Sequence, residues 1–254
     1  MPEAKLNGVT INYEIAGDGP AVLLTHGYSA TGRMWKPQAD ALKDRYRIIS
    51  WDMRGHGQTE SPGDPAQYSE ELTIGDMLAL MQMLETGPAV IGGLSLGGFM
   101  SLAFHLAHPE LVRALVLCDT GPGYRNPEAR AGWNRAAHKR AEQLEATGLA
   151  ALGSSTEVRA TGKYHKSAQG LAHAARGMLA QFDDRIINHL PDIRVPTLVI
   201  VGEQDEPFRG PSDYMAAKIP GARLEVIPNA GHTANLDNPD AVNRVLREFL
   251  DSLP

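Results

Sequence analysis

The sequence has 254 residues but only one cysteine, Cys118, and aromatic side chains make up only 6% of it. A single thiol cannot form an internal disulfide, so a disulfide-stabilised scaffold is excluded. No apolar run reaches the roughly 18 residues of a membrane span. The start of the chain also lacks the cationic residues and apolar core of a secretory signal. These absences predict a soluble, cytoplasmic protein in which Cys118, inside the strand-like run ALVLCD, packs in the core.

Positive charge is also in short supply, with 24 Lys and Arg against 30 Asp and Glu. Phosphate binding needs a basic surface, so nucleic acid is not an expected partner. The deficit is uneven, because residues 121–190 carry 10 Lys and Arg against 6 Asp and Glu. The rest of the chain has 14 against 24, so the basic character is confined to one segment.

The apolar residues, 43% of the chain, are arranged as short runs separated by helical patterns. Near the start, two alternating segments flank Asn7-Gly8, a dipeptide that favours a hairpin turn. Several of the later runs are apolar throughout, as strands covered on both faces are. Alternating strands and helices predict an α/β fold with a doubly wound, parallel sheet. The six predicted parallel strands are AVLLT, YRIIS, PAVIGG, RALVLCD, PTLVIVG and RLEVI.

The alternation is interrupted between Gly121 and Leu190, where Ala-rich and Arg-rich helical patterns follow one another without a credible strand. The interval is too long for a simple connection. We therefore predict a core domain of residues 1–120 and 191–254, with residues 121–190 inserted as a helical cap over one end of the sheet.

A serine lies among glycines where one strand candidate passes into a helix, in the segment Gly93-Leu94-Ser95-Leu96-Gly97. This is the Gly-x-Ser-x-Gly pattern of a nucleophile elbow, in which small residues avoid collisions around a strained turn. Glycine pairs also mark ordinary turns, so the pattern alone is not decisive. Its strand-to-helix context favours Ser95 as a nucleophile.

A serine hydroxyl needs a base, and the base needs an orienting acid. His232 follows the last strand candidate and is the only one of nine histidines C-terminal to the later acids. Asp205 directly follows a buried strand candidate and is the favoured acid, whereas Asp119, at the end of an earlier strand, is a rival. The remaining histidines fit loops or the surfaces and ends of helices.

Acyl transfer also needs donors for a developing oxyanion. The backbone N–H of Leu96, directly after the nucleophile, is one candidate. The second is the backbone N–H of Tyr28, in the loop after AVLLTHG.

Taken together, the segments HGY, DMRGHGQTESP, GLSLG, GEQD and AGH make the sequence resemble the α/β-hydrolase family over essentially its whole length. The resemblance implies an eight-stranded, mostly parallel sheet flanked by helices, with a cap after the sixth strand. It also implies a small-molecule substrate and neither a metal nor an organic cofactor. Asp52, Arg54 and His56 of DMRGHGQ are interpreted as structural rather than as metal ligands.

Within that family, Ser95 excludes the epoxide hydrolases and haloalkane dehalogenases, which have aspartate as nucleophile. The segment GHTANLDNP after the last strand looks more like serine carboxylesterases and enol-lactonases than like carbon-carbon bond hydrolases. We expect a carboxylic-ester hydrolase acting on a small ester or lactone. A carbon-carbon bond hydrolase, a cofactor-free haloperoxidase-like enzyme and a ligand-binding receptor of the same fold stay open as alternatives.

The basic segment has two interpretations. Its cations can form the solvated face of an amphipathic helix. Alternatively, one or two of them, Arg125 or Arg159, lean toward the catalytic entrance and favour substrates that carry a carboxylate.

Overall fold

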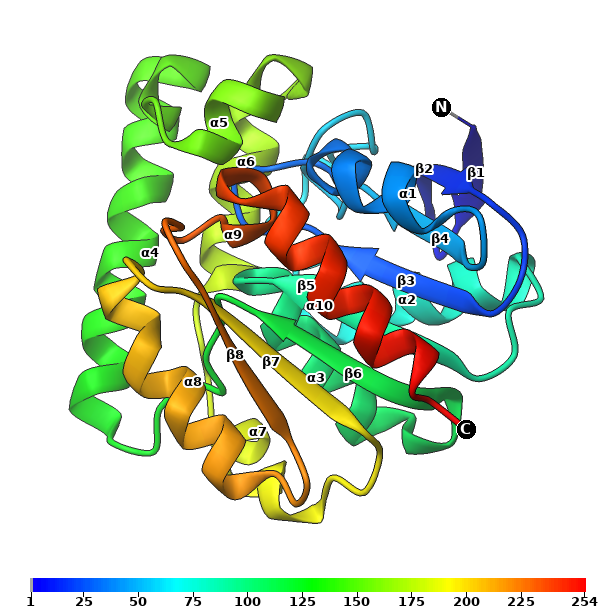
Figure 1. Cartoon of the computed structure of the whole chain (residues 1–254). Helices are drawn as coiled ribbons and strands as arrows, with labels where there is room; N and C mark the ends of the chain where they lie inside the picture. Colours follow the sequence, from blue (N-terminus) through cyan, green and yellow to red (C-terminus); the bar gives the residue numbers. More distant parts are fainter. Residues whose placement is uncertain (1) are drawn as a thin grey trace.

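The computed structural model describes residues 2–254, and its centre is a twisted eight-stranded sheet (Figure 1). The strand order is β1-β2-β4-β3-β5-β6-β7-β8. Strands β3 to β8 run parallel, as predicted, while β1 and β2 are antiparallel to their neighbours. The strands are β1 (Glu3–Leu6), β2 (Val9–Ala16), β3 (Ala21–Thr25), β4 (Arg47–Trp51), β5 (Ala89–Leu94), β6 (Val112–Cys118), β7 (Thr197–Gly202) and β8 (Arg223–Ile227).

The hairpin that opens the fold is confirmed. Leu6 pairs with Val9 across a two-residue turn, in which Asn7 and Gly8 both have positive φ, 46° and 83°. A type I′ turn needs this conformation at both central positions. The hairpin joins the sheet through β2, which pairs with β4.

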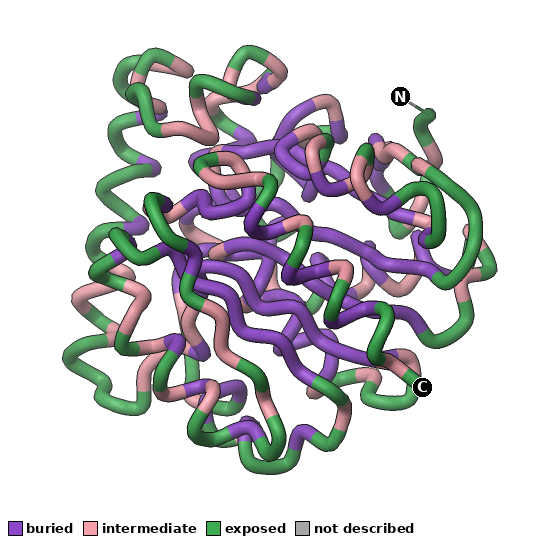
Figure 2. Tube along the Cα trace, in the orientation of Figure 1, coloured by how far each residue is buried: buried purple, intermediate pink, exposed green. Residues whose placement is uncertain are grey.

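Helices cover both faces of the sheet (Figure 1). On one face α1 and α10 pack with the alternate side chains of the strands; on the other, α2, α3 and α8 cover a second cluster. The central strands β3 to β7 are buried between these layers, whereas the edge strands β1 and β8 are partly exposed (Figure 2). The α-helices are α1 (Lys36–Leu42), α2 (Glu70–Met83), α3 (Leu96–Ala107), α4 (Pro127–Thr147), α5 (Thr156–Thr161), α6 (Ala168–Ala174), α7 (Arg185–His189), α8 (Glu206–Lys218), α9 (Ala234–Asp237) and α10 (Pro239–Asp251).

Residues 121–190, named here the helical segment, connect β6 to β7 through α4, α5, α6 and α7. No strand interrupts this part of the described chain, as predicted. The long α4 stands beside the carboxyl end of the sheet and packs against α6 (Figure 1). Its outer side is largely exposed (Figure 2). The division into a core domain and a cap at residues 121 and 190 stays a prediction.

Candidate active site

Ser95 lies at the junction of β5 and α3 with φ 54° and ψ −115°. A side chain would collide at the two flanking glycines, as predicted. A Cβ at Gly93 would lie 2.4 Å from the carbonyl carbon of Gly97, and a Cβ at Gly97 would lie 2.2 Å from the carbonyl oxygen of Thr25. Both distances are far below van der Waals contact, so this turn, which presents the Ser95 hydroxyl at the sheet edge, requires glycine at both positions.

Three side chains from separate loops meet at this turn. The Ser95 hydroxyl lies 3.0 Å from His232 Nε2, and His232 Nδ1 lies 2.9 Å from Asp205 Oδ2. A carboxylate can only accept, so Nδ1 carries the proton and donates it to Asp205. Nε2 is then free to accept from the Ser95 hydroxyl. The structure thus brings together the three residues that the sequence predicted.

The surroundings of His232 favour its protonated form. Burial lowers the pKa of the imidazole, but the hydrogen bond and charge of Asp205 raise it, and the charges of Asp119 and Glu157 add to that effect. The net result is a pKa above the ordinary value of 6.5. An imidazole held this way is a stronger base than a free one.

The rival acid Asp119 lies close by but is bonded elsewhere. Its Oδ1 accepts from the backbone N–H of Gly202 at 2.7 Å, and its Oδ2 accepts from that of Ala234 at 3.1 Å. Burial raises the pKa of Asp119 to about 7, while these amides and the charge of His232 act in the opposite direction. Asp119 therefore ties the strand end at Gly202 to the loop that carries His232.

Cys118, the residue before Asp119, is buried in β6. Its thiol donates to Asp119 Oδ2 at 3.3 Å. Burial raises the pKa of this thiol. Cys118 therefore packs in the core, as the sequence predicted.

The two predicted oxyanion donors lie on either side of Ser95. Leu96 is the first residue of α3, where a backbone N–H has no acceptor within the helix. Tyr28 lines the same cavity as Ser95 and His232. Its neighbour Gly27 runs so close to the nucleophile that a Cβ there would lie 3.4 Å from Ser95 Cβ. Both main-chain segments therefore border the space in front of the Ser95 hydroxyl.

The loop that carries Tyr28 is bonded to the helical segment at three places. The Tyr28 hydroxyl donates to the carbonyl of Leu171 at 2.9 Å. His165 Nε2 lies 2.9 Å from the carbonyl of Ser29, whose φ is +64°. The backbone N–H of Thr31 donates to the Thr161 hydroxyl at 3.2 Å. The helical segment therefore holds the backbone conformation of this loop. His165 follows the last residue of the short 3-10 helix Gly162–Tyr164, at a helix end as expected, and it is buried in this contact.

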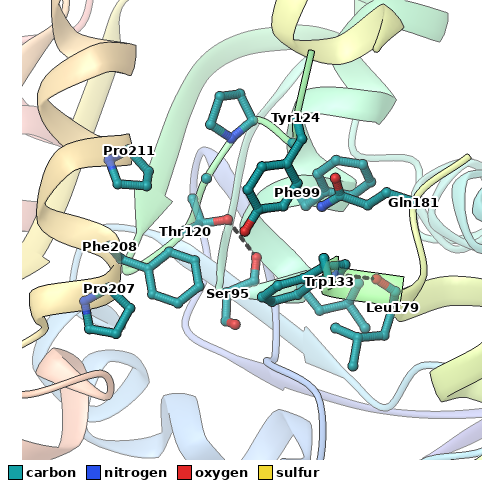
Figure 3. Close-up of a pocket in the computed structure, with 14 residues that line it drawn as sticks. Ser95, Phe99, Thr120, Tyr124, Trp133, Leu179, Gln181, Pro207, Phe208 and Pro211 are labelled. Atoms are coloured by element: carbon teal, nitrogen blue, oxygen red, sulfur yellow. Dashed lines mark hydrogen bonds between the residues drawn. The ribbon is translucent and has the colours of Figure 1, made fainter. Parts of the chain in front are cut away.

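Two cavities meet at Ser95. The first, named here the aromatic cavity, has a volume of about 100 Å³ (Figure 3). In that view Ser95 lies between Phe208, Pro207 and Pro211 of α8 on one side and Trp133 of α4 on the other. Its side chains are Ser95, Leu96, Phe99, Thr120, Pro122, Tyr124, Trp133, Leu179, Gln181, Pro207, Phe208 and Pro211.

The second, named here the histidine cavity, has a volume of about 330 Å³ and contains the polar side chains of Arg140, Glu157, Asp205 and His232. Gly27, Tyr28 and Ser29 also line it, and Trp133, Leu179 and Phe208 line both cavities. The volume of the histidine cavity lies in the range typical of small-molecule sites. The sequence offered no signal for Phe208, Arg140 or Trp133, because their positions depend on how the helices pack.

The expectation that Arg125 or Arg159 leans toward the entrance is wrong. Arg125 bonds to Asn188 and to Tyr214, outside both cavities. Arg159 bonds to the carbonyl of Ser154, which precedes its own short helix, and to the hydroxyl of Thr156 at the start of that helix. The cation that lines the histidine cavity is Arg140, which α4 presents toward the loop of Tyr28. Side-chain partners, rather than position in the sequence, decide which cation faces the site.

Residues 52–58 form a buried network beside the Tyr28 loop. Asp52 accepts from the backbone N–H of Gly32 at 2.7 Å and from Asn12 at 2.8 Å. Arg54 makes a fully buried ion pair with Asp76 at 2.6 Å. His56 is also buried, and burial lowers its pKa well below 6.5. These contacts agree with the structural interpretation of this motif.

Within residues 2–254, no group of three or more histidine, cysteine or carboxylate side chains is arranged to hold a metal ion. No helix in the same range is both long and apolar enough to cross a membrane.

Comparison with known proteins finds similarity over most of the chain. The sequence profile of the "Alpha/beta hydrolase family" matches residues 22–245. A 3-oxoadipate enol-lactonase 1 from Acinetobacter baylyi is 30% identical, over 97% of this chain and 95% of its own. A putative 2-succinyl-6-hydroxy-2,4-cyclohexadiene-1-carboxylate synthase from Bacillus subtilis is 29% identical, over 96% of both chains. The structure of a thermophilic esterase from Thermogutta terrifontis has a TM-score of 0.87 and 30% identity, covering 100% of this chain and 99% of its own.

Proposed function

Because this chain belongs to the alpha/beta hydrolase family, we propose that it cleaves a small carboxylic ester or lactone through an acyl-enzyme intermediate. The observation that carries the proposal is the continuous hydrogen-bonded chain from the Ser95 hydroxyl through His232 to Asp205, 3.0 Å and 2.9 Å long at its two links. Similarity to an esterase and an enol-lactonase supports the same substrate class.

In the acylation half-reaction, Ser95 Oγ attacks the carbonyl carbon and His232 Nε2 takes the hydroxyl proton. Asp205 keeps the proton of Nδ1 in place and stabilises the imidazolium that forms. The backbone N–H groups of Tyr28 and Leu96 donate to the oxyanion, and each such donor contributes roughly 10² to 10³ in kcat. When the bond to the leaving alcohol breaks, the imidazolium gives its proton to the departing oxygen.

In the deacylation half-reaction, water takes the place of the alcohol. His232 removes a proton from it, the water oxygen attacks the acyl carbon, and the bond to Ser95 Oγ breaks. The proton on His232 returns to Ser95, so the enzyme is regenerated and a carboxylic acid is released. The scheme needs no metal or organic cofactor.

Steady-state kinetics on a panel of small esters, lactones and vinylogous diketones tests the proposal. We expect turnover of an ester or lactone, and Ser95→Ala should lower kcat by roughly 10⁶ without a comparable change in substrate binding. Near-native turnover by folded Ser95→Ala would contradict the proposed nucleophile. Turnover of the diketones alone would instead support a carbon-carbon bond hydrolase.

A second candidate is a reaction in which Ser95 and His232 act as a general base on a substrate that carries carboxylates. The similarity to a protein named as a carboxylate synthase and the position of Arg140 in the histidine cavity favour it. This candidate requires no covalent intermediate, so detection of an acyl-enzyme distinguishes it from ester hydrolysis. The cytoplasmic location and the absence of nucleic-acid partners rest on the sequence and stay predictions.

A further inference from the structure

The two cavities at Ser95 differ in their access to the proposed base. His232 and Asp205 line the histidine cavity but do not line the aromatic cavity. Phe99 and Tyr124, in contrast, line only the aromatic cavity. A substrate bonded to Ser95 therefore has two chemically distinct spaces into which its two ends can extend.

The chemistry of acyl transfer assigns each end of the substrate to one of the two cavities. In the tetrahedral intermediate the central carbon carries Ser95 Oγ, the oxyanion, the leaving oxygen and the acyl chain. The leaving oxygen must lie within hydrogen-bond reach of His232 Nε2, because that nitrogen supplies its proton. The oxyanion lies against the backbone N–H groups. The acyl chain takes the remaining direction, which points away from His232. The aromatic cavity lies in that direction, because it is lined by Ser95 but not by His232.

We propose that the aromatic cavity binds an apolar acyl group and that the histidine cavity binds a polar leaving alcohol. This inference rests on the proposed function, since it assumes attack by Ser95 and protonation by His232. Phe99, Tyr124, Trp133, Leu179 and Phe208 present mainly hydrocarbon surface to the acyl side. Burial of apolar groups there selects a short aliphatic or aromatic acyl chain.

The histidine cavity, proposed to bind the leaving alcohol, is lined by charged side chains instead. Arg140 and Glu157 line the histidine cavity together with Tyr28 and Ser29. These four residues also line part of a neighbouring cavity. Among the ion pairs of residues 2–254, none involves the Arg140 or Glu157 side chain, whereas nearby Arg176 is paired with Glu145 at 2.7 Å. The Arg140 guanidinium is thus free to bind an oxygen of the leaving alcohol.

Separation of the two half-reactions tests the assignment, because the alcohol has departed before deacylation begins. Acylation is followed by rapid mixing with p-nitrophenyl butyrate and p-nitrophenyl octanoate. Deacylation is followed by the decay of the acyl-enzyme in intact-protein mass spectra. For the leaving side, kcat/KM is compared between carboxymethyl butyrate and its neutral analogue propyl butyrate. Each variant is referred to the wild type on the same ester, so intrinsic ester reactivity cancels.

We expect Phe99→Ala to change the deacylation rate. It should also shift the octanoate-to-butyrate preference at least about 10-fold toward octanoate, because removing the phenyl ring makes room in the aromatic cavity for several more methylene groups of the acyl chain. Phe99→Trp should shift the preference in the opposite direction, which a loss of folding cannot do. Arg140→Gln should lower the preference for carboxymethyl butyrate by about 2- to 5-fold, the size expected for a solvent-exposed charge contact, without changing deacylation. Lys139→Gln, its exposed neighbour on α4, is the matched control and should change neither quantity.

The reverse pattern would overturn the assignment: Arg140→Gln altering deacylation or acyl-length preference, with Phe99→Ala altering only the preference for the alcohol. A leaving-group preference that is the same in Arg140→Gln and the wild type would also overturn it. Failure of the proposed function has a separate signature, because then no acyl-enzyme would form from any of these esters and Ser95→Ala would retain turnover.

Discussion

Phe208 stacks on the imidazole of His232, with ring centroids 4.7 Å apart and ring planes inclined by 29°. Stacking covers one face of the imidazole and leaves both ring nitrogens free at its edge. Those nitrogens lie next to Asp205 and Ser95. Phe208 therefore restricts tilting of the ring, in addition to lining both cavities.

Replacement of Phe208 by alanine should lower kcat by about 2- to 12-fold, which corresponds to the 0.5 to 1.5 kcal/mol of an aromatic pair. The reason is that an imidazole without the stacked Phe208 ring can tilt more freely and is aligned with Ser95 for a smaller fraction of the time. Phe182→Ala is the matched control, because Phe182 is 70% exposed and lines neither cavity. A Phe208→Ala enzyme with a raised KM but an unchanged kcat would limit Phe208 to substrate binding.

The two candidate acids should respond differently to amide substitution. Asp205→Asn should lower kcat by up to about 10⁴, because the charge that orients His232 is lost. Asp119→Asn should mainly lower stability, by about 1 to 3 kcal/mol, since the amide NH₂ that replaces one carboxylate oxygen cannot accept from the backbone N–H of Gly202 or Ala234. Kinetics and thermal unfolding of both variants check this. A nearly harmless Asp205→Asn beside a severely impaired Asp119→Asn would reverse the assignment of the acid.

The pH dependence should follow the raised pKa of His232. The base must be neutral, so kcat/KM should rise with pH through an apparent pKa above 6.5 and level off beyond it. Glu157→Gln removes a negative charge that favours the imidazolium, so its rise should occur at lower pH than that of the wild type. Glu142→Gln, at an exposed position on α4, should leave the profile unchanged. A flat profile between pH 5 and 8 would argue against His232 as the base.

The contact between Tyr28 and Leu171 should influence turnover through the loop that carries Tyr28, a proposed oxyanion donor. Tyr28→Phe removes the bond to the Leu171 carbonyl, at a cost of about 1 kcal/mol in stability, and should lower kcat by about 5-fold with little change in KM. Tyr68→Phe is the matched control, because Tyr68 also donates to a carbonyl, that of Pro62, away from Ser95. We expect it to lower stability but not kcat. Equal kcat values for the two variants would show that the contact is only structural.

Local sequence rules were sufficient where a short segment dictates its own geometry. The Asn7-Gly8 turn and the steric need for Gly93 and Gly97 follow from backbone conformation alone. The proximity of Ser95, Asp205 and His232 was also predictable, because residues at the carboxyl ends of neighbouring parallel strands share one edge of the sheet. Their catalytic roles stay predictions until they are tested by substitution.

Features that depend on packing between distant helices could not be predicted. Arg140 reaches the cavity because its side of α4 faces the Tyr28 loop, whereas Arg125 precedes α4 and bonds to Tyr214. His165 lies between Ser29 and Gly57, two loops more than 100 residues away in sequence. Neither contact leaves a periodic or compositional signal in the sequence.

Covalent labelling of Ser95 is the most direct test of the central claim. The wild-type protein and Ser95→Ala are treated with an alkyl organophosphonate that carries a good leaving group, and intact mass and peptide maps are recorded. An activated Ser95 predicts one phosphonyl group per chain, on the peptide containing Ser95, with loss of esterase activity in the same proportion and no label on Ser95→Ala. A folded wild-type protein that takes up no label, or takes it up equally in Ser95→Ala, would contradict the account.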